Sequence, residues 1–259
     1  MASLPNTERF TGRAEAYARF RPGYPEAVID LLRAEAGWTP DAVVADIGAG
    51  TGISTEYFLR HGNAVWAVEP NQSMREAAAT LRRQYPKLEV VDGTAEASTL
   101  PDECVDLVVA ATAFHWFDAA ATRTEFLRIL KPRGQAVLMW NKRVAESSPF
   151  LGAYEDLLLR FGTDYQERWA KDRHEIAERI AGFFGAARFR EASFANPQPL
   201  DLEGLMGRLL SASYAPLPGH PNHEPMMAEA REVFAAHQQD GHITFEYRTV
   251  VYWGRPALP

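Results

Sequence analysis

The sequence predicts an α/β fold in which helices cover both faces of a doubly wound, largely parallel sheet. Between residues 42 and 141, short apolar segments rich in valine alternate with segments of helical pattern. Strands that are covered on both faces have this nearly continuous apolar character. The first apolar segment runs into a glycine-rich turn that opens a helix, as expected where a strand of an open sheet enters its crossover. Alternation of this kind implies right-handed crossovers.

The expected strands are short apolar runs bounded by turn residues. Those of the parallel part are Ala42–Ile47, Ala64–Glu69, Leu88–Val91, Val105–Ala110 and Gln135–Asn141. Later in the chain, Ala187–Ala195 and Ile243–Trp253 have β character. The mixed charge of the second of these segments favours a position near a sheet edge.

Two helices of the N-terminal half have readable ends. Pro25 opens an amphipathic helix before the first strand, and Gly37 ends it. The segment Ser73–Glu76 has the residue pattern of a capping box, which predicts the start of a helix that runs toward Tyr85.

Further helices are expected in the second half of the chain. Asp118 is the expected N-cap of a helix over Ala119–Leu130, which Lys131–Gly134 terminates. Residues 150–185 have a helical pattern crowded with aromatic side chains, and a helix-rich insertion over 201–237 separates the last two strands.

The composition indicates a folded protein with a substantial core. The chain has 259 residues, 46% of them hydrophobic, and a net charge of -7. A broad nucleic-acid footprint would be basic, so nucleic acid is not an expected partner. No apolar run reaches the length of a membrane span, the N-terminus lacks the apolar core of a signal peptide, and Cys104 is the only cysteine. We expect a cytoplasmic protein without membrane contact, and the oligomeric state stays open.

The glycine-rich turn after the first strand indicates a ligand that contains a nucleoside. Glycines let the main chain approach a ligand closely, and Glu69, at the end of the second strand, is suited to accept hydrogen bonds from a ribose diol. The turn Gly48–Gly52 has the spacing G-x-G-x-G, and Ile53 stands where a dinucleotide-binding turn needs a small residue. Asp46 would repel a phosphate but suits a ligand with an ammonium or sulfonium group.

Several segments, taken together and in register, resemble the motifs of class I S-adenosylmethionine-dependent methyltransferases. They are Asp46–Gly52, Glu69–Asn71, Asp92–Glu96, Val105–Val109, Phe114–Asp118 and Leu130–Gly134. The resemblance implies S-adenosyl-L-methionine as the cofactor and no metal. The residues that it implies for cofactor binding are Arg21, Asp46, Gly48, Ala49, Gly50, Gly52, Glu69, Pro70, Met74, Thr94, Ala95, Glu96 and Ala111.

The same resemblance implies a Rossmann-like, seven-stranded mixed sheet whose last two strands form an antiparallel hairpin, with helical lid insertions. We expect a single methyltransferase domain over residues 1–259. It would comprise an N-terminal helical cover (1–41), a cofactor-binding core (42–141), and lid helices with a C-terminal β-hairpin (142–259).

A narrower resemblance points to a small-molecule branch of the family, methyltransferase type 11, which includes trans-aconitate methyltransferases. The segments that carry it are Tyr17–Pro25, Phe114–Asp118, Leu210–Tyr214 and Tyr252–Arg255. One departure from the family is Thr94, because many members have an acid at that position. The adenine contact is therefore open between Thr94, Glu96 and the main chain.

Some side chains have alternative interpretations. Arg21 is either a surface charge or the partner of the cofactor's methionine carboxylate. His115 is either the general base of the reaction or part of an aromatic wall. Tyr214 and Trp140 are the candidates for contacts with the acceptor. The segment His220–His223 contains a proline, so we interpret it as a loop and not as a zinc site.

The function expected from the resemblance is methyl transfer from S-adenosylmethionine to a small molecule, with an oxygen such as a carboxylate or hydroxyl as the acceptor atom. Two other classes stay open. One is a regulatory protein that binds S-adenosylmethionine without turnover. The other is a nucleotide-dependent oxidoreductase, which the position of Ile53 and the charge of Asp46 disfavour.

Overall fold

The computed structural model describes residues 13–185 and 188–258, with the side chains of all of these except 167–175. Its main sheet has seven strands in the order β3-β2-β1-β4-β5-β9-β6, and β7 and β8 form a second sheet of two strands. The strands are β1 Val43–Ile47, β2 Ala64–Val68, β3 Leu88–Val91, β4 Val105–Ala111, β5 Leu130–Arg143, β6 Arg190–Ala195, β7 Gln198–Leu200, β8 Ile243–Phe245 and β9 Tyr247–Gly254.

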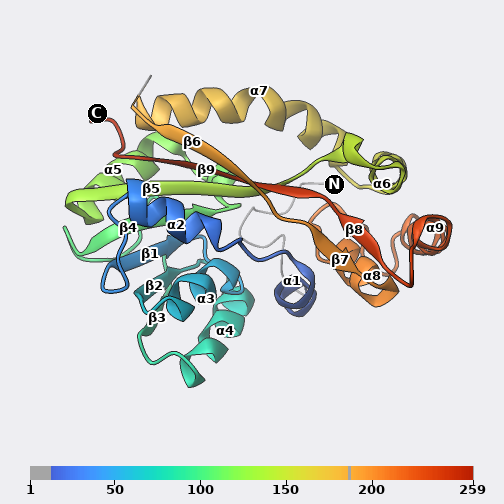
Figure 1. The fold of residues 1–259 in the computed structure, drawn as a ribbon, viewed down its shortest axis with the longest axis horizontal. Helices are drawn as coiled ribbons and strands as arrows, with labels where there is room; N and C mark the ends of the chain where they lie inside the picture. The colour runs from blue at the N-terminus through green and yellow to red at the C-terminus, as the bar shows by residue number, and fades with distance from the viewer. Residues whose placement is uncertain (1–12, 186–187, 259) are drawn as a thin grey trace.

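The predicted fold class is confirmed. Strands β1 to β5 are parallel, whereas β9 is antiparallel to both β5 and β6. The expected strand at Ala187–Ala195 is β6, and Ala187 itself lies outside the described residues. Between β6 and β9 the chain inserts β7, two helices and β8, as expected of the helix-rich insertion (Figure 1).

The start of β5 explains the predicted turn at Lys131–Gly134. Leu130 pairs with Val105, but the next pair in the ladder is Gln135 with Leu107. The four residues of Lys131–Gly134 therefore lie outside the regular pairing, although the strand as a whole begins at Leu130. The helix before it ends one residue earlier than expected, at Ile129.

Helices occupy the predicted places. They are α1 Ala14–Phe20, α2 Ala27–Glu35, α3 Ile53–Arg60, α4 Gln72–Ala79, α5 Ala119–Ile129, α6 Pro149–Phe161, α7 Tyr165–Phe184, α8 Leu202–Leu210 and α9 His223–His237. Asp118 caps α5 as predicted, because its side chain accepts hydrogen bonds from the main-chain N–H groups of Ala120 and Ala121. The predicted capping box at Ser73 is wrong. Asn71 is the cap of α4 and accepts from the N–H of Met74.

The sheet is covered on both faces, and successive residues of a strand enter different cores. On β5, Ala136 and Leu138 belong to the core under α5 and α7, whereas Val137 and Met139 belong to the core under α2 and α3. This alternation follows from the two-residue period of a strand. It explains why the strands are apolar at almost every position.

A third core lies beyond the end of the sheet. It joins α6, α8, α9 and β8, and these elements lie together at one side of the molecule in Figure 1. The long strands β5 and β9 connect this part to the sheet, since their pairing continues to Arg143 and Tyr247. Helix α1 packs between α4 and α8. At one contact a Cβ on Gly207 would come within 2.1 Å of the Phe20 ring, so α1 and α8 approach closely only because residue 207 is glycine.

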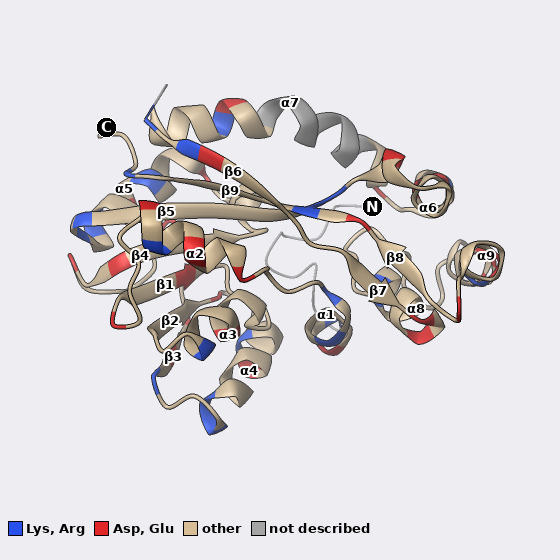
Figure 2. Cartoon of the chain, viewed as in Figure 1, with Lys and Arg blue, Asp and Glu red and all other residues tan. Residues whose placement is uncertain are grey.

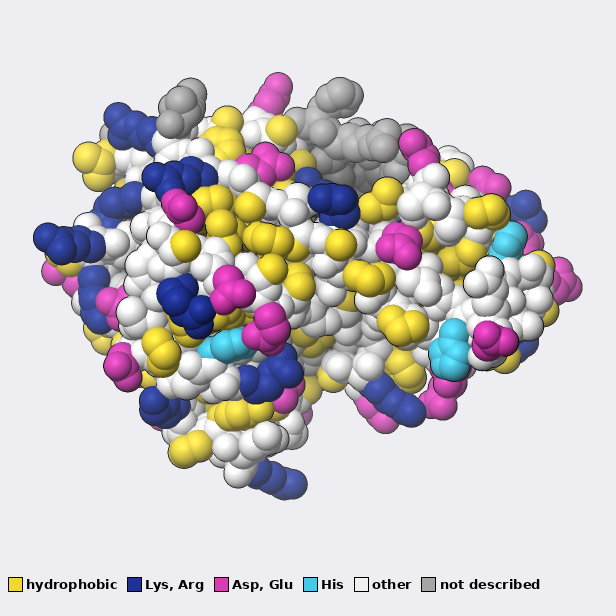
Figure 3. All heavy atoms as spheres, viewed as in Figure 1, with side chains coloured by type: hydrophobic (Ala, Val, Ile, Leu, Met, Phe, Trp, Pro, Cys, Tyr) yellow, Lys and Arg dark blue, Asp and Glu magenta, His cyan; other side chains and the backbone are white. Residues whose placement is uncertain are grey.

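Charged residues of both signs are interspersed over the elements (Figure 2) and over the face shown in Figure 3. Among the described residues, no helix is long and apolar enough to cross a membrane. The same part of the chain contains no cluster of three or more His, Cys, Asp or Glu residues that could hold a metal ion.

Candidate active site

A cavity opens at the carboxyl ends of the parallel strands, where the strand order reverses between β1 and β4. Ligands of open α/β sheets bind at this switch point. The cavity measures about 1240 Å³ including the open space at its mouth. Its wall is built by the segments after β1, β2, β3 and β4, by residues near the N-terminus, and by α8 and β9.

The structure brings most of the predicted cofactor-binding residues together in this wall. Those that line the cavity are Arg21, Gly48, Ala49, Gly50, Glu69, Pro70, Met74, Thr94, Ala95, Glu96 and Ala111. Asp46, Gly52 and His115 do not line it.

The glycine turn forms the floor of the cavity and needs its glycines. Gly48 and Gly50 have left-handed φ angles of 71° and 58°. A Cβ on Gly48 would lie 2.8 Å from the Cβ of Ala113, whereas a Cβ on Gly50 would meet nothing within 4 Å. The N–H of Gly48 is bonded to the carbonyl of Val68 at 2.9 Å, which ties the turn to the end of β2. Gly50 therefore leaves main chain open to a ligand.

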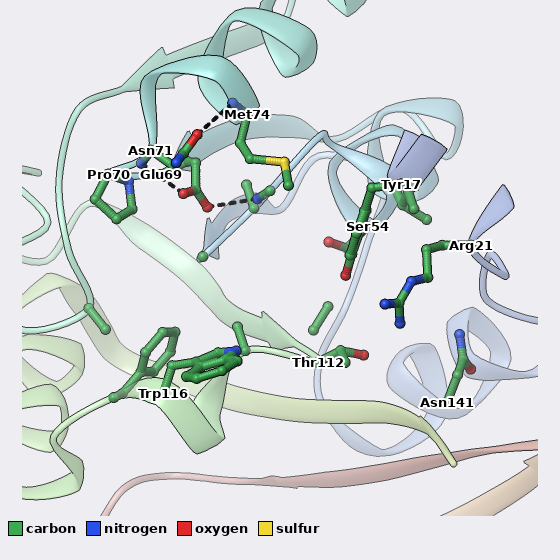
Figure 4. Close-up of a pocket in the computed structure, with 18 of the residues that line it drawn as sticks. Tyr17, Arg21, Ser54, Glu69, Pro70, Asn71, Met74, Thr112, Trp116 and Asn141 are labelled. Carbon is green, nitrogen blue, oxygen red and sulfur yellow. Dashed lines mark hydrogen bonds between the residues drawn. The ribbon is translucent and has the colours of Figure 1, made fainter. Parts of the chain in front are cut away.

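Glu69 lies beside this turn at the end of β2. Its Oε2 accepts from the N–H of Gly50 at 2.9 Å, and its Oε1 accepts from the N–H of Asn71 at 2.9 Å. Burial raises the pKa of Glu69, and these two hydrogen bonds oppose the rise. Figure 4 shows Glu69, Asn71 and Met74 grouped at one end of the cavity. Each carboxylate oxygen keeps a lone pair beyond its main-chain bond, so Glu69 is suited to accept from a diol.

Asp46 lies behind the wall, not in it. Its side chain is fully buried, with 0% exposed, and Oδ2 accepts from Ser54 Oγ at 2.7 Å and Thr55 Oγ1 at 2.6 Å. Oδ1 has no hydrogen-bond partner within the described part of the chain. Burial raises the pKa of Asp46 to about 6, against the effect of the bonds from Thr55 and Ser54. Asp46 therefore affects the cavity through its charge and not through contact with its space.

Gly52 has a packing role in the structure. It is the N-cap of α3 with a φ of 93°. A Cβ there would lie 2.8 Å from Leu81 Cδ1, so the glycine lets α3 approach the end of α4.

The segment 21–26, here called the N-terminal strap, crosses the cavity on the side opposite Glu69. The side chains of Asn141 and Asn196 both donate to the carbonyl of Gly23, each at 2.9 Å. Tyr57 donates to the carbonyl of Pro25 at 2.9 Å. These bonds hold the strap against β5, the end of β6 and α3.

Arg21 points from the strap into the cavity (Figure 4). Its Nε donates to Ser211 Oγ at 3.0 Å, its Nη2 donates to the carbonyl of Ser211 at 3.1 Å, and its guanidinium stacks on Tyr17. Burial lowers the pKa of Arg21, and the positive charge of Arg208 lowers it further. The interpretation of Arg21 as a surface charge is therefore wrong. The cavity has an anionic end at Glu69 and a cationic end at Arg21.

Sequence reasoning missed several lining residues, among them Thr112, Arg208 and Tyr247. Thr112 follows β4 with a left-handed φ of 56°, which is uncommon for a β-branched residue and marks a strained position in the wall. No local signal in the sequence distinguishes these residues. Arg208 and Tyr247 belong to α8 and β9, and only the packing of the third core against the strap brings them to the cavity.

The candidates for the general base and for acceptor contacts, His115, Trp140 and Tyr214, are not among the residues that line the cavity. His115 packs against Trp116, and its Nδ1 accepts a long hydrogen bond of 3.5 Å from Trp140 Nε1. Trp140 is buried between Phe114 and Tyr252. None of these side chains lines the cavity, although Trp116 does.

Tyr214 lies behind the cationic end. It packs edge-on against Tyr165 at a ring distance of 4.8 Å and is hydrogen bonded to Arg143. Its pKa is lowered: burial raises it, but the charges of Arg143, Arg208 and Arg21 lower it more. At Tyr214 the charges of these guanidinium groups therefore outweigh the effect of burial.

Comparisons with known proteins agree with this geometry. The family model described as a methyltransferase domain matches residues 45–138. An uncharacterised methyltransferase of Mycobacterium tuberculosis is 40% identical over 52% of this chain and 52% of its own length, so the match spans about half of that relative. An uncharacterised methyltransferase of Schizosaccharomyces pombe is 27% identical over 91% of this chain and 92% of its own.

A solved structure supports the fold independently. It is that of a putative type II methyltransferase from Anaeromyxobacter dehalogenans, which is 20% identical, has a TM-score of 0.68, and covers 91% of this chain and 98% of its own. At this identity the likeness concerns the fold alone. Residues 45–138 thus match a methyltransferase domain, the chain is similar to proteins named as methyltransferases, and its fold is that of a methyltransferase structure.

Proposed function

We propose that this protein transfers a methyl group from S-adenosylmethionine to a small-molecule acceptor, at an oxygen atom. The observation that carries the proposal is the polarity of the cavity. Glu69 and the glycine turn form one end, and Arg21 lies at the other. S-adenosylmethionine has a ribose diol toward one end and a carboxylate at the other, so its two ends match a hydrogen-bond-accepting carboxylate and a guanidinium, respectively.

The residues present fit the nucleoside part of this cofactor. Met74 and Ala95 are apolar and buried in the wall, and Pro70 follows Glu69 directly. Glu96 accepts from the N–H of Asp118 at 2.8 Å through Oε1, which leaves its Oε2 for the exocyclic amine of an adenine. We therefore assign the adenine contact to Glu96 in preference to Thr94.

When bound, S-adenosylmethionine supplies an electrophilic methyl group, so the protein's task is to align the acceptor and exclude water. The strap closes the cavity on one side, and Tyr24 on the strap reaches to within 3.5 Å of Thr112 Oγ1 across it. Trp116 and Phe117 form an apolar wall nearby. Together they form a partly enclosed space beside the glycine turn.

The wall favours an acceptor that needs no proton removed. Among the described lining residues, the acids are Glu69 and Glu96, at the nucleoside end, and no histidine or lysine is present. A carboxylate is already anionic and requires no general base, whereas a hydroxyl would require one. This supports carboxylate oxygen as the acceptor atom.

Binding measurements test the proposal. Isothermal titration of the purified protein with S-adenosylhomocysteine is expected to give one site per chain, and Glu69→Gln is expected to weaken it about tenfold or more through lost charge-assisted hydrogen bonds. Glu89→Gln, at an exposed position of β3, is the matched control and should bind as the parent does. Thermal shifts by nicotinamide nucleotides but not by S-adenosylhomocysteine would instead indicate the oxidoreductase.

Turnover separates an enzyme from a cofactor-binding regulator. Incubation with S-adenosylmethionine and a broad panel of small carboxylic acids is expected to release S-adenosylhomocysteine with at least one acid. Tight cofactor binding without product across such a panel favours the regulatory alternative.

A further inference from the structure

Arg208 is a buried cation that forms no ion pair with any of the residues described. It lies on α8, beside the third core, and only 4% of it is exposed. Its Nε donates to the hydroxyl of Tyr247 at 2.9 Å, and its guanidinium lies 5.9 Å from the ring centres of Tyr247 and Phe245. No described residue accepts a hydrogen bond from Nη1. Burying a guanidinium costs free energy that neutral partners do not fully offset.

The surroundings of Arg208 add positive charge. Arg21 lines the same end of the cavity and has only neutral partners, in Ser211 and Tyr17. Behind them, Arg143 is hydrogen bonded to Glu155 and to the hydroxyl of Tyr165 at 2.7 Å, so its charge is balanced locally. Arg21 and Arg208 therefore face one space with two charges that no carboxylate of the described residues balances.

We propose that Arg208, with the hydroxyl of Tyr247, forms a subsite that binds an oxyanion of the methyl acceptor. Both side chains line the cavity. Nη1 of Arg208, which has no hydrogen-bond partner among the described residues, supplies a charged donor. The hydroxyl of Tyr247 already accepts from Arg208 Nε, so its own hydrogen is available for donation to a ligand. A carboxylate or a phosphate monoester on the acceptor has the matching chemistry. This inference rests on the proposed function, because it assigns Arg208 to the acceptor of that reaction.

The cofactor alone cannot balance this end of the cavity. S-adenosylmethionine carries one carboxylate together with an ammonium and a sulfonium group, so its binding adds net positive charge to a site with two guanidinium groups. Arg21 lies on the strap, on the same side of the cavity as Ser54 (Figure 4), and in this proposal its guanidinium binds the carboxylate of the cofactor. Arg208 and Tyr247 lie outside the matched methyltransferase segment 45–138. An acceptor with a negative charge supplies the missing balance.

The experiment measures anion binding to the complex with S-adenosylhomocysteine. The probes are benzoate, hexanoate and succinate, each paired with its uncharged amide, and inorganic phosphate. The variants are Arg208→Met, which removes the charge, Arg208→Lys, which keeps it, and Arg21→Gln. Arg19→Gln is the matched control, because Arg19 pairs with Glu203 across the same α1–α8 contact but its side chain is 62% exposed.

We expect the parent complex to bind at least one carboxylate, or phosphate, at least tenfold more tightly than any amide. Arg208→Met should abolish this preference while changing the dissociation constant of S-adenosylhomocysteine less than threefold, and Arg208→Lys should keep part of it. Arg21→Gln should instead weaken S-adenosylhomocysteine tenfold or more. Binding by phosphate alone would identify a phosphorylated acceptor, and binding by carboxylates a carboxylic acid.

A stability measurement keeps the test independent of folding defects. Arg208→Met without ligand should keep a cooperative thermal transition like that of the parent, so that a lost anion preference is not a folding defect; if it does not, Arg208→Lys against the parent carries the comparison. The inference is overturned if no anion binds in preference to its amide, if Arg208→Met binds anions as the parent does, or if it weakens S-adenosylhomocysteine as much as it weakens anions. Failure of the parent to bind S-adenosylhomocysteine would refute the proposed function instead, since anion binding can then be measured on the protein alone.

Discussion

Asp46→Asn is expected to stabilise the protein at neutral pH. Burial raises the pKa of Asp46 from an ordinary 3.8 to about 6. At a pH above both values, where the carboxylate is charged, this difference lowers the unfolding free energy by about 3 kcal/mol. An asparagine of the same shape keeps an oxygen that can accept from Ser54 and Thr55 and carries no charge.

The sign of the pH dependence follows from proton binding. Between about pH 4 and pH 6 the folded protein retains the Asp46 proton that the unfolded chain has released, so the stability contributed by this group is lost as the pH rises through that window. The variant lacks this loss. The difference in unfolding free energy, variant minus parent, should therefore increase by about 2.4 kcal/mol from pH 4 to pH 7.5.

Urea unfolding of both proteins without cofactor, at half-unit steps from pH 4 to pH 8, measures this difference. Any constant effect of the amide cancels, because only the trend with pH is used, and Asp41→Asn at an exposed position serves as a control for the substitution itself. A difference that stays flat across the range, or that falls as the pH rises, would refute the reasoning. In the same variant S-adenosylmethionine should lose more affinity than S-adenosylhomocysteine, because only the former carries the sulfonium charge that the Asp46 carboxylate attracts.

Three further substitutions test other parts of the structure. Arg13→Met should lower the unfolding free energy by at least about 2 kcal/mol, because Arg13 is buried and donates to three carbonyls at and after the end of α8; urea unfolding measures this. Gly48→Ala should lower the unfolding free energy by more than the about 1–2 kcal/mol that a left-handed alanine costs, because its Cβ would clash with Ala113. Gly50→Ala is the control: its φ is similar but its Cβ would meet nothing within 4 Å, so it measures the cost of the left-handed conformation alone. His115→Gln should keep methyl-transfer rates within a few-fold of the parent, because the ring lies outside the cavity wall; a loss of a hundredfold or more would restore it as the general base.

Much of the sheet and of the nucleoside end was predictable because both depend on neighbouring residues in the chain. Apolar runs identified the strands, and parallel strands bring their carboxyl ends to one edge, so the turn at Gly48–Gly50 and Glu69 had to lie close together. Local capping was less predictable. Asn71 and Ser73 both suit an N-cap, and the choice of Asn71 depends on where the chain leaves β2.

The sequence alone determined the fold class and predicted a methyltransferase domain with the segments proposed to bind its cofactor, since these follow from periodicity and from short motifs read in order. The tertiary structure decided which side chains line the cavity. It left His115 and Tyr214 outside the wall, placed Asp46 behind the wall, and brought Arg208 to the cavity from a position far along the chain. The physical reason is that α8 is held near the strap by the packing of a separate core and by the close contact of Gly207 with Phe20. These contacts join residues far apart in the chain, and no local sequence pattern encodes them.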